Sequence, residues 1–301
     1  MNYKAFEEFC KAEKIEYKIN EPMQKHTSFK IGGPADYFVT VASVAELQKT
    51  LLKLNELKVP FFIIGKGSNL LVSDKGIDGV VISLSLIDDI SVENGIISAG
   101  AGASLAAVCI AAAENSLTNL EFAYGIPASV GGAVYMNAGA YGGEMADVVL
   151  KAEYVNYKGE IGEISAKDMA LGYRTSIFKK SDKIITRVYF KLSNGDKSEI
   201  RALMDDFLSR RKTKQPLEYP SAGSTFKRPE GYFAGALIEK NNLKGVSVGG
   251  AMVSEKHAGF VINYGNATCE DVKKLMEHIK ETVLKADSVT LQPEVIFVGR
   301  D

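Results

Sequence analysis

Glycine is concentrated in three segments of this 301-residue sequence, and each segment lies close to polar side chains. The segments are KIGGPAD (30–36), GKGSNLLVSD (65–74) and GIPASVGGAVYMNAGAYGGE (125–144). Backbone without a Cβ atom can approach a ligand closely and can turn its N–H groups toward a phosphate. GKGSN also follows a predicted buried strand, and Ser68 and Asn69 add side-chain donors. We therefore expect these segments to bind a phosphate-containing ligand, and tight turns alone are the alternative.

A second candidate for chemistry is Glu294, which follows Pro293 in an apolar segment with the pattern of a strand. A carboxylate in such surroundings requires a partner or a raised pKa, because burial disfavours its charged form. Groups perturbed in this way are concentrated at functional sites. Glu294 is therefore a site candidate on physical grounds alone.

Two common nucleotide-binding motifs are missing from the sequence. There is no Walker motif, which disfavours hydrolysis of nucleoside triphosphates. No GxGxxG opens a helix after a first strand, and GAGASL (100–105), the nearest match, lacks the third glycine. A nicotinamide-binding Rossmann fold is therefore not supported.

Composition and charge exclude several further classes of protein. The net charge is −1, so no overall field favours nucleic acid or a membrane surface. The three cysteines, Cys10, Cys109 and Cys269, form no CxxC pair, so we expect neither a metal site nor a disulfide framework. The N-terminus lacks the apolar run of a signal peptide, and no segment approaches the ~20 apolar residues of a membrane span. We expect a cytoplasmic protein without membrane insertion.

Periodicity predicts helices and strands that are interspersed along the chain but do not form regular βαβ units. Helices are expected at 43–57, 104–115, 199–212 and 269–285, and strands at 59–64, 80–85 and 96–102, with the terminal segment 289–299 extended again. The apolar face expected at 199–212 holds Ile200, Leu203 and Phe207, and that at 269–285 holds Val272, Leu275, Met276, Ile279 and Val283. Ser43 and Glu46 form a predicted capping box for the first helix. The class is therefore α+β. A charged stretch at 195–215 is the expected domain boundary.

Several motifs together resemble the series found in the UDP-N-acetylenolpyruvoylglucosamine reductases (the MurB family). They are HTSFKIGGPAD (26–36), GKGSNLLVSD, GIPASVGGAVYMNAGAYGGE, YRTSIF (173–178), SAGSTFKRP (221–229) and LQPEVIFVG (291–299). They occur in that family's order and cover nearly the whole chain. One departure is Ala128, where members of the family usually carry glycine. The short length resembles the smaller subtype, which lacks a tyrosine loop over the substrate.

The resemblance implies a fold and a cofactor. The fold would be a two-subdomain FAD-binding domain of the vanillyl-alcohol-oxidase (PCMH) type followed by an α+β substrate-binding domain. Residues 1–83 with 286–301 would form the first subdomain, 84–197 the second, and 198–285 the substrate-binding domain. FAD would be bound non-covalently, without attachment through His26. The residues expected to bind it are Gly65, Lys66, Gly67, Ser68, Asn69, Ala128, Ser129, Gly131, Gly132 and Asn137.

The implied reaction is the reduction of an enolpyruvyl ether on a UDP-sugar by NADPH, through FAD, in peptidoglycan precursor synthesis. A hydride from flavin N5 would reach the β carbon, and negative charge would then build on the α carbon and its carboxylate. The protein must orient the substrate, stabilise that charge and deliver a proton. Arg174 fits the carboxylate, because its planar fork binds one with two hydrogen bonds. The resemblance assigns the proton to Ser224 and stabilisation of the enol to Glu294.

Four further residues are expected on the substrate side. Lys214 and Arg228 lie on either side of Ser224 and could hold the UDP diphosphate; Arg228 replaces an asparagine of some relatives. His257, in SEKHAGFVI, aligns with a substrate-side position, although a lone histidine is more often structural. Tyr124 stands directly before GIPASVGG and could touch substrate or flavin, with packing as the alternative. The partners expected are therefore NADPH and the UDP-sugar, with no nucleic acid.

Two other functions remain open from the sequence. One is an FAD-dependent oxidase or dehydrogenase of an alcohol or hydroxy acid, which would not need Ser224. The other is a non-catalytic flavin- or nucleotide-binding module, which would keep the glycine segments but not Arg174, Ser224 and Glu294 together. The presence of all three residues argues against the module. The sequence does not indicate an oligomeric state.

Overall fold

The computed structural model describes residues 3–301, which divide into two compact units that the chain visits in turn. The first unit takes the chain as far as Ile19, then Tyr37–Lys66 and Gly79–Arg210. The second unit takes Asn20–Asp36, Gly67–Asp78 and Arg211–Asp301. Each unit has its own hydrophobic core. Helices and strands mix in both units, so the α+β class is confirmed.

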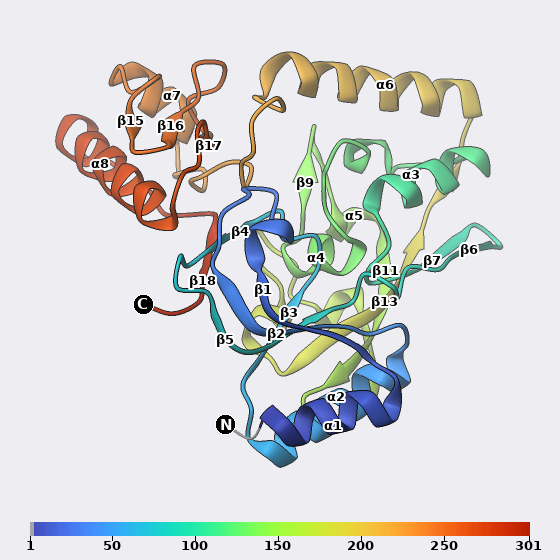
Figure 1. Cartoon of the computed structure of the whole chain (residues 1–301). Helices are drawn as coiled ribbons and strands as arrows, with labels where there is room; N and C mark the ends of the chain where they lie inside the picture. The colour runs from blue at the N-terminus through green and yellow to red at the C-terminus, as the bar shows by residue number, and fades with distance from the viewer. Residues whose placement is uncertain (1–2) are drawn as a thin grey trace. The chain divides into compact units, whose positions relative to one another are not determined.

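The core of the first unit is built on a five-stranded antiparallel sheet. Its strands, in spatial order, are β12 (Ile161–Ser165), β11 (Val149–Asn156), β13 (Lys183–Lys191), β7 (Ile96–Gly100) and β6 (Ile90–Glu93). Two helices pack on it, α3 (Leu105–Glu114) and α4 (Val130–Tyr135) (Figure 1). Apolar side chains such as Ile97, Val188 and Phe190 are fully buried here. The sheet therefore provides the rigid base on which the third glycine-rich segment lies.

A second sheet has the strand order β1 (Glu16–Pro22), β2 (Pro34–Thr40), β5 (Ile77–Ser83) and β3 (Phe61–Ile64). Strands β3 and β5 pair in parallel, from Phe61 with Val80 to Ile64 with Ser83. Helices α1 (Tyr3–Glu13) and α2 (Val44–Leu57) pack against each other (Figure 1). Ser43 caps α2 as predicted, but Glu46 reaches back to the N–H of Ala42 rather than that of Ser43.

Shorter elements complete the first unit. They are β8 (Leu117–Thr118), η2 (Glu121–Ala123), β9 (Gly139–Ala140), β10 (Gly143–Glu144), α5 (Met145–Val148), η3 (Ala166–Asp168), η4 (Ile177–Lys180) and β14 (Ser193–Asn194). Helix α6 (Lys197–Lys214) follows, and the division between the units crosses it after Arg210. The helix predicted here is confirmed, but Leu203 does not lie on its buried side. Leu203 is 41% exposed, whereas Ile200 and Met204 are buried.

The second unit contains a three-stranded antiparallel sheet of β15 (Ser247–Val248), β16 (Ala251–Val253) and β17 (Val261–Asn263). Helix α8 (Cys269–Asp287) packs on β15 and β16, and α7 (Ala234–Lys240) packs on α8 (Figure 1). The predicted apolar face of α8 is confirmed, because Val272, Leu275, Ile279 and Val283 are fully buried. The short helix η1 (Met23–Lys25) also belongs to this unit.

A pair of parallel strands joins distant parts of the chain within the second unit. Strand β4 (Leu70–Val72) directly follows GKGSN, and β18 (Ile296–Val298) directly follows the segment that carries Glu294. They pair from Leu70 with Ile296 to Val72 with Val298. This pairing brings a glycine-rich loop and the candidate carboxylate to the same end of one strand pair.

Candidate active site

The second and third glycine-rich segments meet in the first unit. Strand β3 ends at Ile64, and a Cβ atom on the next residue, Gly65, would lie only 2.3 Å from Oγ of Ser129. Ser129 is the N-cap of α4, where its hydroxyl accepts a hydrogen bond from the N–H of Gly132 at 3.3 Å. The contact therefore requires glycine at position 65 and joins the two loops predicted to hold a cofactor.

The start of α4 is bonded to the segment before α3. The N–H groups of Val130 and Gly131 donate to the carbonyls of Ala103 and Ala101, both at 2.9 Å. A Cβ atom on Gly131 would lie 2.9 Å from that of Ala101, so this close approach also requires glycine. Two of the N–H groups in the ASVGG turn are thus occupied by protein carbonyls. Gly131 serves the packing of the loop, whatever else it contacts.

In the turn after β3, unlike the ASVGG turn, three successive backbone N–H groups are not occupied by protein carbonyls in the described part of the chain. Among residues 3–301, no carbonyl or side chain accepts a hydrogen bond from the N–H groups of Lys66, Gly67 or Ser68. Gly67 has a φ of +59°, and a Cβ atom there would lie 2.1 Å from the carbonyl oxygen of His26. Consecutive backbone donors of this kind fit the pyrophosphate of FAD.

Ala128, the departure from the family's usual glycine, is accommodated without backbone strain. It is not among the residues with positive φ. Its methyl group is buried, and its carbonyl accepts a hydrogen bond from the N–H of Leu105 at 3.1 Å. The alanine therefore leaves the shape of the loop intact.

Asn137 connects the third glycine-rich segment to the loop that carries Arg174. Its side-chain oxygen accepts from the N–H of Ala146 at 2.9 Å, and its amide donates to the carbonyl of Gly172 at 3.1 Å. Asn137 is 1% exposed and has a φ of +44°, a conformation that asparagine tolerates better than most residues. A second bond, from Ser176 Oγ to the carbonyl of Tyr135 at 2.7 Å, fixes the same loop to the end of α4.

Arg174 occupies the tip of that loop. Gly172 and Thr175 exchange two backbone hydrogen bonds, both at 3.1 Å, which close a tight turn around it. Arg174 has a φ of +54°, a strained conformation for a residue with a long side chain. Lys179 donates to its carbonyl at 3.0 Å, and its guanidinium lies 5.3 Å from the ring centre of Tyr173. Strain that is held in place by surrounding bonds is common at functional sites.

In the second unit, the segment that carries Ser224 pairs with the segment that carries Glu294, although 70 residues separate these two in the chain. The N–H of Glu294 donates to the carbonyl of Thr225, the residue after Ser224, at 2.9 Å. Thr225 is buried and is itself fixed, since its N–H bonds to the carbonyl of Gly259 and its hydroxyl accepts from the N–H of Val261, both at 2.9 Å. Ser224 and Glu294 are both half-buried.

Asn69 also holds the backbone of Glu294. Its side-chain amide donates to the carbonyl of Glu294 at 3.1 Å, and its own carbonyl accepts from the N–H of Ile296 at 2.9 Å. The sequence placed Asn69 in the cofactor loop only. The structure adds that this residue positions the carboxylate-bearing segment.

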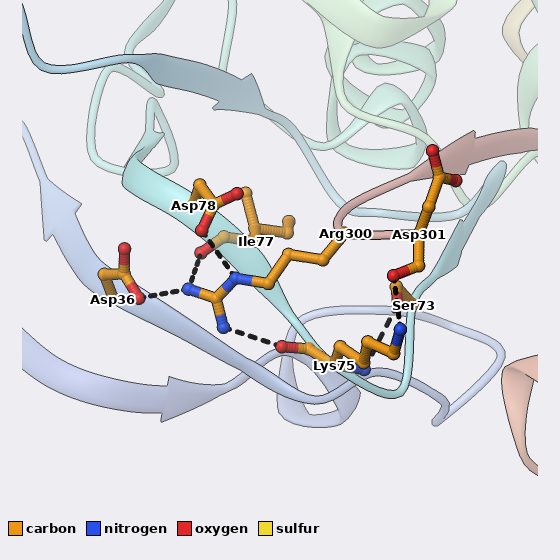
Figure 2. Close-up of polar contacts among 7 residues, drawn as sticks. All are labelled: Asp36, Ser73, Lys75, Ile77, Asp78, Arg300 and Asp301. Atoms are coloured by element: carbon orange, nitrogen blue, oxygen red, sulfur yellow. Dashed lines mark hydrogen bonds and ion pairs between the residues drawn. The ribbon is translucent and has the colours of Figure 1, made fainter.

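The far end of the same segment is fixed by Arg300 (Figure 2). Its guanidinium donates to Asp78 at 2.6 Å, to the carbonyl of Lys75 at 2.7 Å, and to Asp36. Asp78 and Asp36 raise the pKa of Arg300 above its ordinary value. The segment from Glu294 to Arg300 is therefore held at both ends of β18.

His257 lies beside the first turn of α7. Its Nδ1 accepts a hydrogen bond from the N–H of Gly259 at 3.1 Å, and a Cβ atom on Gly235 would lie 3.3 Å from its Cε1. Burial, assisted by the positive charge of Lys244, lowers the pKa of His257 below its ordinary value of 6.5. The ring is therefore neutral at pH 7.

The two basic candidates on either side of Ser224 are exposed. Arg228 lies with its guanidinium carbon 4.0 Å from the ring centre of Phe233. Lys214 is the last residue of α6, close in sequence to Lys212, whose carbonyl accepts from Lys256 at 2.8 Å. Tyr124 lies in the first unit, half-buried at the end of η2.

The structure thus gathers part of the predicted site in each unit. Ser224, Glu294, Arg228, His257 and Lys214 belong to the second unit. Arg174, Tyr124 and the loop from Ala128 to Asn137 belong to the first. That Arg174 meets Ser224 and Glu294 stays a prediction.

Two residues of this site were missed in the sequence. The signal for Thr225 was its place in GSTF, directly after the candidate proton donor. Phe233 gave no local signal, because its contact with Arg228 depends on the path of the intervening turn. No group of three or more His, Cys, Asp and Glu side chains suited to a metal ion occurs in residues 3–301. The same residues include no helix with the length and apolarity required to cross a membrane.

Two family models match the chain. The FAD binding domain matches residues 35–165, and the C-terminal domain of UDP-N-acetylenolpyruvoylglucosamine reductase matches residues 215–298. The fold is thus an FAD-binding domain followed by the C-terminal domain of this reductase family, as expected.

Relatives with the same name resemble nearly the whole chain. The UDP-N-acetylenolpyruvoylglucosamine reductase of Caldanaerobacter subterraneus subsp. tengcongensis is 52% identical over 281 residues, which are 93% of each chain. That of Clostridium perfringens (strain SM101) is 48% identical over 299 residues, 99% of this chain and 98% of the relative. The crystal structure of the Thermus caldophilus enzyme superimposes with a TM-score of 0.81 at 35% identity, covering 94% of this chain and 98% of that one. Identity at this level over this length makes the chain a member of the UDP-N-acetylenolpyruvoylglucosamine reductase family.

Proposed function

We propose that this enzyme reduces UDP-N-acetylglucosamine enolpyruvate to UDP-N-acetylmuramate with NADPH, through FAD, in the cytoplasm, as a step of peptidoglycan precursor synthesis. One observation carries the proposal. The backbone bond from Glu294 to Thr225, at 2.9 Å, brings together the segments that carry Ser224 and Glu294, which are distant in the chain. A module that only bound a flavin would not need this arrangement.

FAD, when bound, supplies the hydride that the substrate's double bond accepts. The donors of the turn after β3, with Lys66, Gly67, Ser68 and Asn69, would hold its pyrophosphate. Gly65, Ala128, Ser129, Gly131, Gly132 and Asn137 shape the adjoining loop. The close contact of Gly65 with Ser129 supports this assignment.

Arg174 binds the carboxylate of the enolpyruvyl group. As the double bond is reduced, negative charge spreads into this carboxylate, and a guanidinium fork stabilises it with two charge-assisted hydrogen bonds. The closed turn from Gly172 to Thr175 supports this role, since it fixes the backbone of Arg174 before substrate arrives. A group fixed in advance does not have to be ordered during the reaction.

Ser224 donates a proton to the α carbon, and Glu294 stabilises the enol. A serine hydroxyl is a weak acid, so it serves this role only when it is held close to a carbon that carries developing negative charge. Thr225, fixed through three hydrogen bonds, limits the movement of Ser224. Asn69 and Arg300 do the same for the segment that carries Glu294.

The substrate lies against a domain formed by residues 198–285. The FAD-binding part has two subdomains. Residues 1–83 together with 286–301 form the first, and residues 84–197 form the second. Lys214 and Arg228 bind the UDP diphosphate, while His257 and Tyr124 contribute further contacts. His257 is neutral at pH 7 and so offers a hydrogen bond rather than a charge. NADPH binds the same pocket before the UDP-sugar.

An anaerobic experiment tests the proposal. The purified FAD-loaded protein is reduced with one equivalent of NADPH, UDP-N-acetylglucosamine enolpyruvate is added, and flavin absorbance is followed. We expect the absorbance to return and UDP-N-acetylmuramate to appear in equal amount. If the flavin stays reduced with this substrate but is rapidly oxidised by oxygen, the chain is an oxidase on the same fold and the proposal is wrong.

A further inference from the structure

Arg228 and Phe233 form a pair that neither the reaction nor the core of the second unit explains. The guanidinium carbon of Arg228 lies 4.0 Å from the centre of the Phe233 ring. This ring is 61% exposed, which makes Phe233 one of the most exposed large apolar residues of residues 3–301. We propose that Phe233 is a positioning residue that holds the Arg228 guanidinium for the diphosphate of the substrate. The inference rests on the proposed function, because the diphosphate belongs to the UDP-sugar.

The backbone between the two residues enforces their contact. The N–H of Tyr232 donates to the carbonyl of Pro229 at 3.1 Å, and Gly231 has a φ of +74°, so the chain reverses direction between Arg228 and Phe233. Phe233 is then fixed as the N-cap of α7, where its carbonyl accepts from the N–H of Leu237 at 3.1 Å. The backbone of Phe233 is therefore fixed at the start of α7, within reach of Arg228.

The geometry of the pair suits an anion. Stacking on an aromatic ring uses the flat face of a guanidinium, whereas phosphate oxygens bind the N–H groups at its edge. Both contacts can therefore form at once. An arginine side chain loses much rotational freedom when it binds, and a ring that already restrains it reduces that loss.

The position of the pair also suits the substrate side of the site. Arg228 follows Ser224 by four residues, and the backbone between them is fixed where the N–H of Lys227 donates to the carbonyl of Gln292 at 2.8 Å. A Cβ atom on Gly235, two residues after Phe233, would lie 3.3 Å from Cε1 of His257, so the first turn of α7 passes close to this ring. Arg228 thus lies on the segment that carries Ser224, and Phe233 precedes the turn of α7 that faces His257.

Binding of UDP and of uridine to the oxidised, FAD-loaded protein, measured by titration calorimetry, tests the proposal. Cation–π contacts at exposed sites predict that Phe233→Leu weakens UDP binding by about two- to fivefold. The affinity for uridine, which has no phosphate, should be the same in the Phe233→Leu variant as in the unaltered protein. Phe233→Trp, which keeps an aromatic ring at this position, should restore UDP binding. Arg228→Gln should weaken UDP binding by at least about tenfold, because it removes a charge-assisted contact. Adding Phe233→Leu to Arg228→Gln should cause no further loss.

Tyr264→Leu provides the matched control, since this aromatic residue of the same unit is 59% exposed and pairs with Tyr219 instead. We expect no effect on UDP binding. The proposal is overturned if Phe233→Leu has no effect, if it weakens uridine equally, or if it still weakens UDP binding in the Arg228→Gln protein. Absence of any UDP binding by the unaltered protein also overturns it. A different result would refute the proposed reaction alone: the flavin is not reoxidised by the UDP-sugar, but Phe233→Leu still weakens UDP binding only when Arg228 is present.

Discussion

The side-chain amide of Asn137 donates a hydrogen bond to the backbone carbonyl of Gly172 at 3.1 Å, two residues before Arg174. A residue of the glycine-rich loop thus fixes the loop that carries the candidate carboxylate-binding arginine. Asn137 is buried, and its side-chain oxygen accepts a second bond from Ala146. The third glycine-rich segment and the loop that carries Arg174 are therefore parts of one connected structure within the first unit.

Asn137→Asp should weaken this connection specifically. The aspartate keeps the acceptor for Ala146 but loses the donor to Gly172, so a buried carboxylate faces a carbonyl whose remaining bond comes from Thr175. We expect a loss of about 1–3 kcal/mol in the free energy of unfolding, together with a raised KM for the enolpyruvyl substrate. Denaturant unfolding and steady-state kinetics measure the two effects. Asn119→Asp is the control, since Asn119 also has positive φ but is exposed. Equal effects of the two variants would contradict the prediction.

Ser224→Ala should separate the two halves of the reaction. We expect reduction of the flavin by NADPH to continue at its normal rate, because this step needs no proton from Ser224. Reoxidation by the UDP-sugar should slow by about 10²–10⁴-fold, the usual contribution of a general acid. Anaerobic stopped-flow absorbance measures both rates. Ser247→Ala, an exposed serine in β15, is the control. Equal slowing of both halves would remove Ser224 from its role as proton donor.

His257 should make the protein sensitive to mild acid. Its pKa is lowered in the folded state, so above pH 6.5 the ring is neutral whether the chain is folded or not. As the pH falls below 6.5, His257 takes up a proton in the unfolded chain before it does so in the folded protein. The free energy of unfolding therefore decreases until the pH reaches the lowered pKa of the folded state. His257→Gln should reduce this loss in unfolding midpoints measured across that range. His278→Gln, exposed on α8, should leave it unchanged. An identical pH profile for all three proteins would show that His257 does not titrate this way.

Arg300→Ala should loosen the end of β18. It removes charge-assisted bonds to Asp78 and Asp36 and a bond to the carbonyl of Lys75. We expect the free energy of unfolding to fall by about 1–2 kcal/mol at low salt, and by less at ~1 M salt, which screens exposed ion pairs. Arg210→Ala breaks an exposed pair on α6 with Asp206 and a long contact of 5.9 Å with the ring of Phe207, and should cost at most about 0.5 kcal/mol. If the two variants lose equal stability, Arg300 is not an anchor.

Local patterns in the sequence were sufficient to predict α2, α3, α6 and α8, but α1 was missed. Helix α8 was predicted from its apolar period because all of its buried residues face one core. The same reasoning misplaced Leu203, because α6 buries only Ile200 and Met204. A period identifies an apolar face but not the part of it that a neighbouring element covers.

Long-range pairing was beyond the sequence. Nothing local in LLV (70–72) indicates that its partner lies at Ile296–Val298, because parallel pairing depends on the path of the intervening chain. The alternation of the chain between two units could not be predicted for the same reason. Motifs identified Ser224, Glu294 and Asn69 as candidates, but only the structure shows the hydrogen bonds of Thr225 and Asn69 to the backbone of Glu294.

The pairing of β4 with β18 has a consequence for the newly synthesised protein. In residues 3–301, β18 is the only strand that pairs with β4, and Ile296 follows its partner Leu70 by 226 residues. At about 5–20 residues per second, a ribosome needs about 11–45 s to cover that interval. Throughout this time three apolar residues present an open strand edge, the kind of surface on which chains aggregate. Slow translation of the last three quarters of the message should therefore lower the yield of folded enzyme.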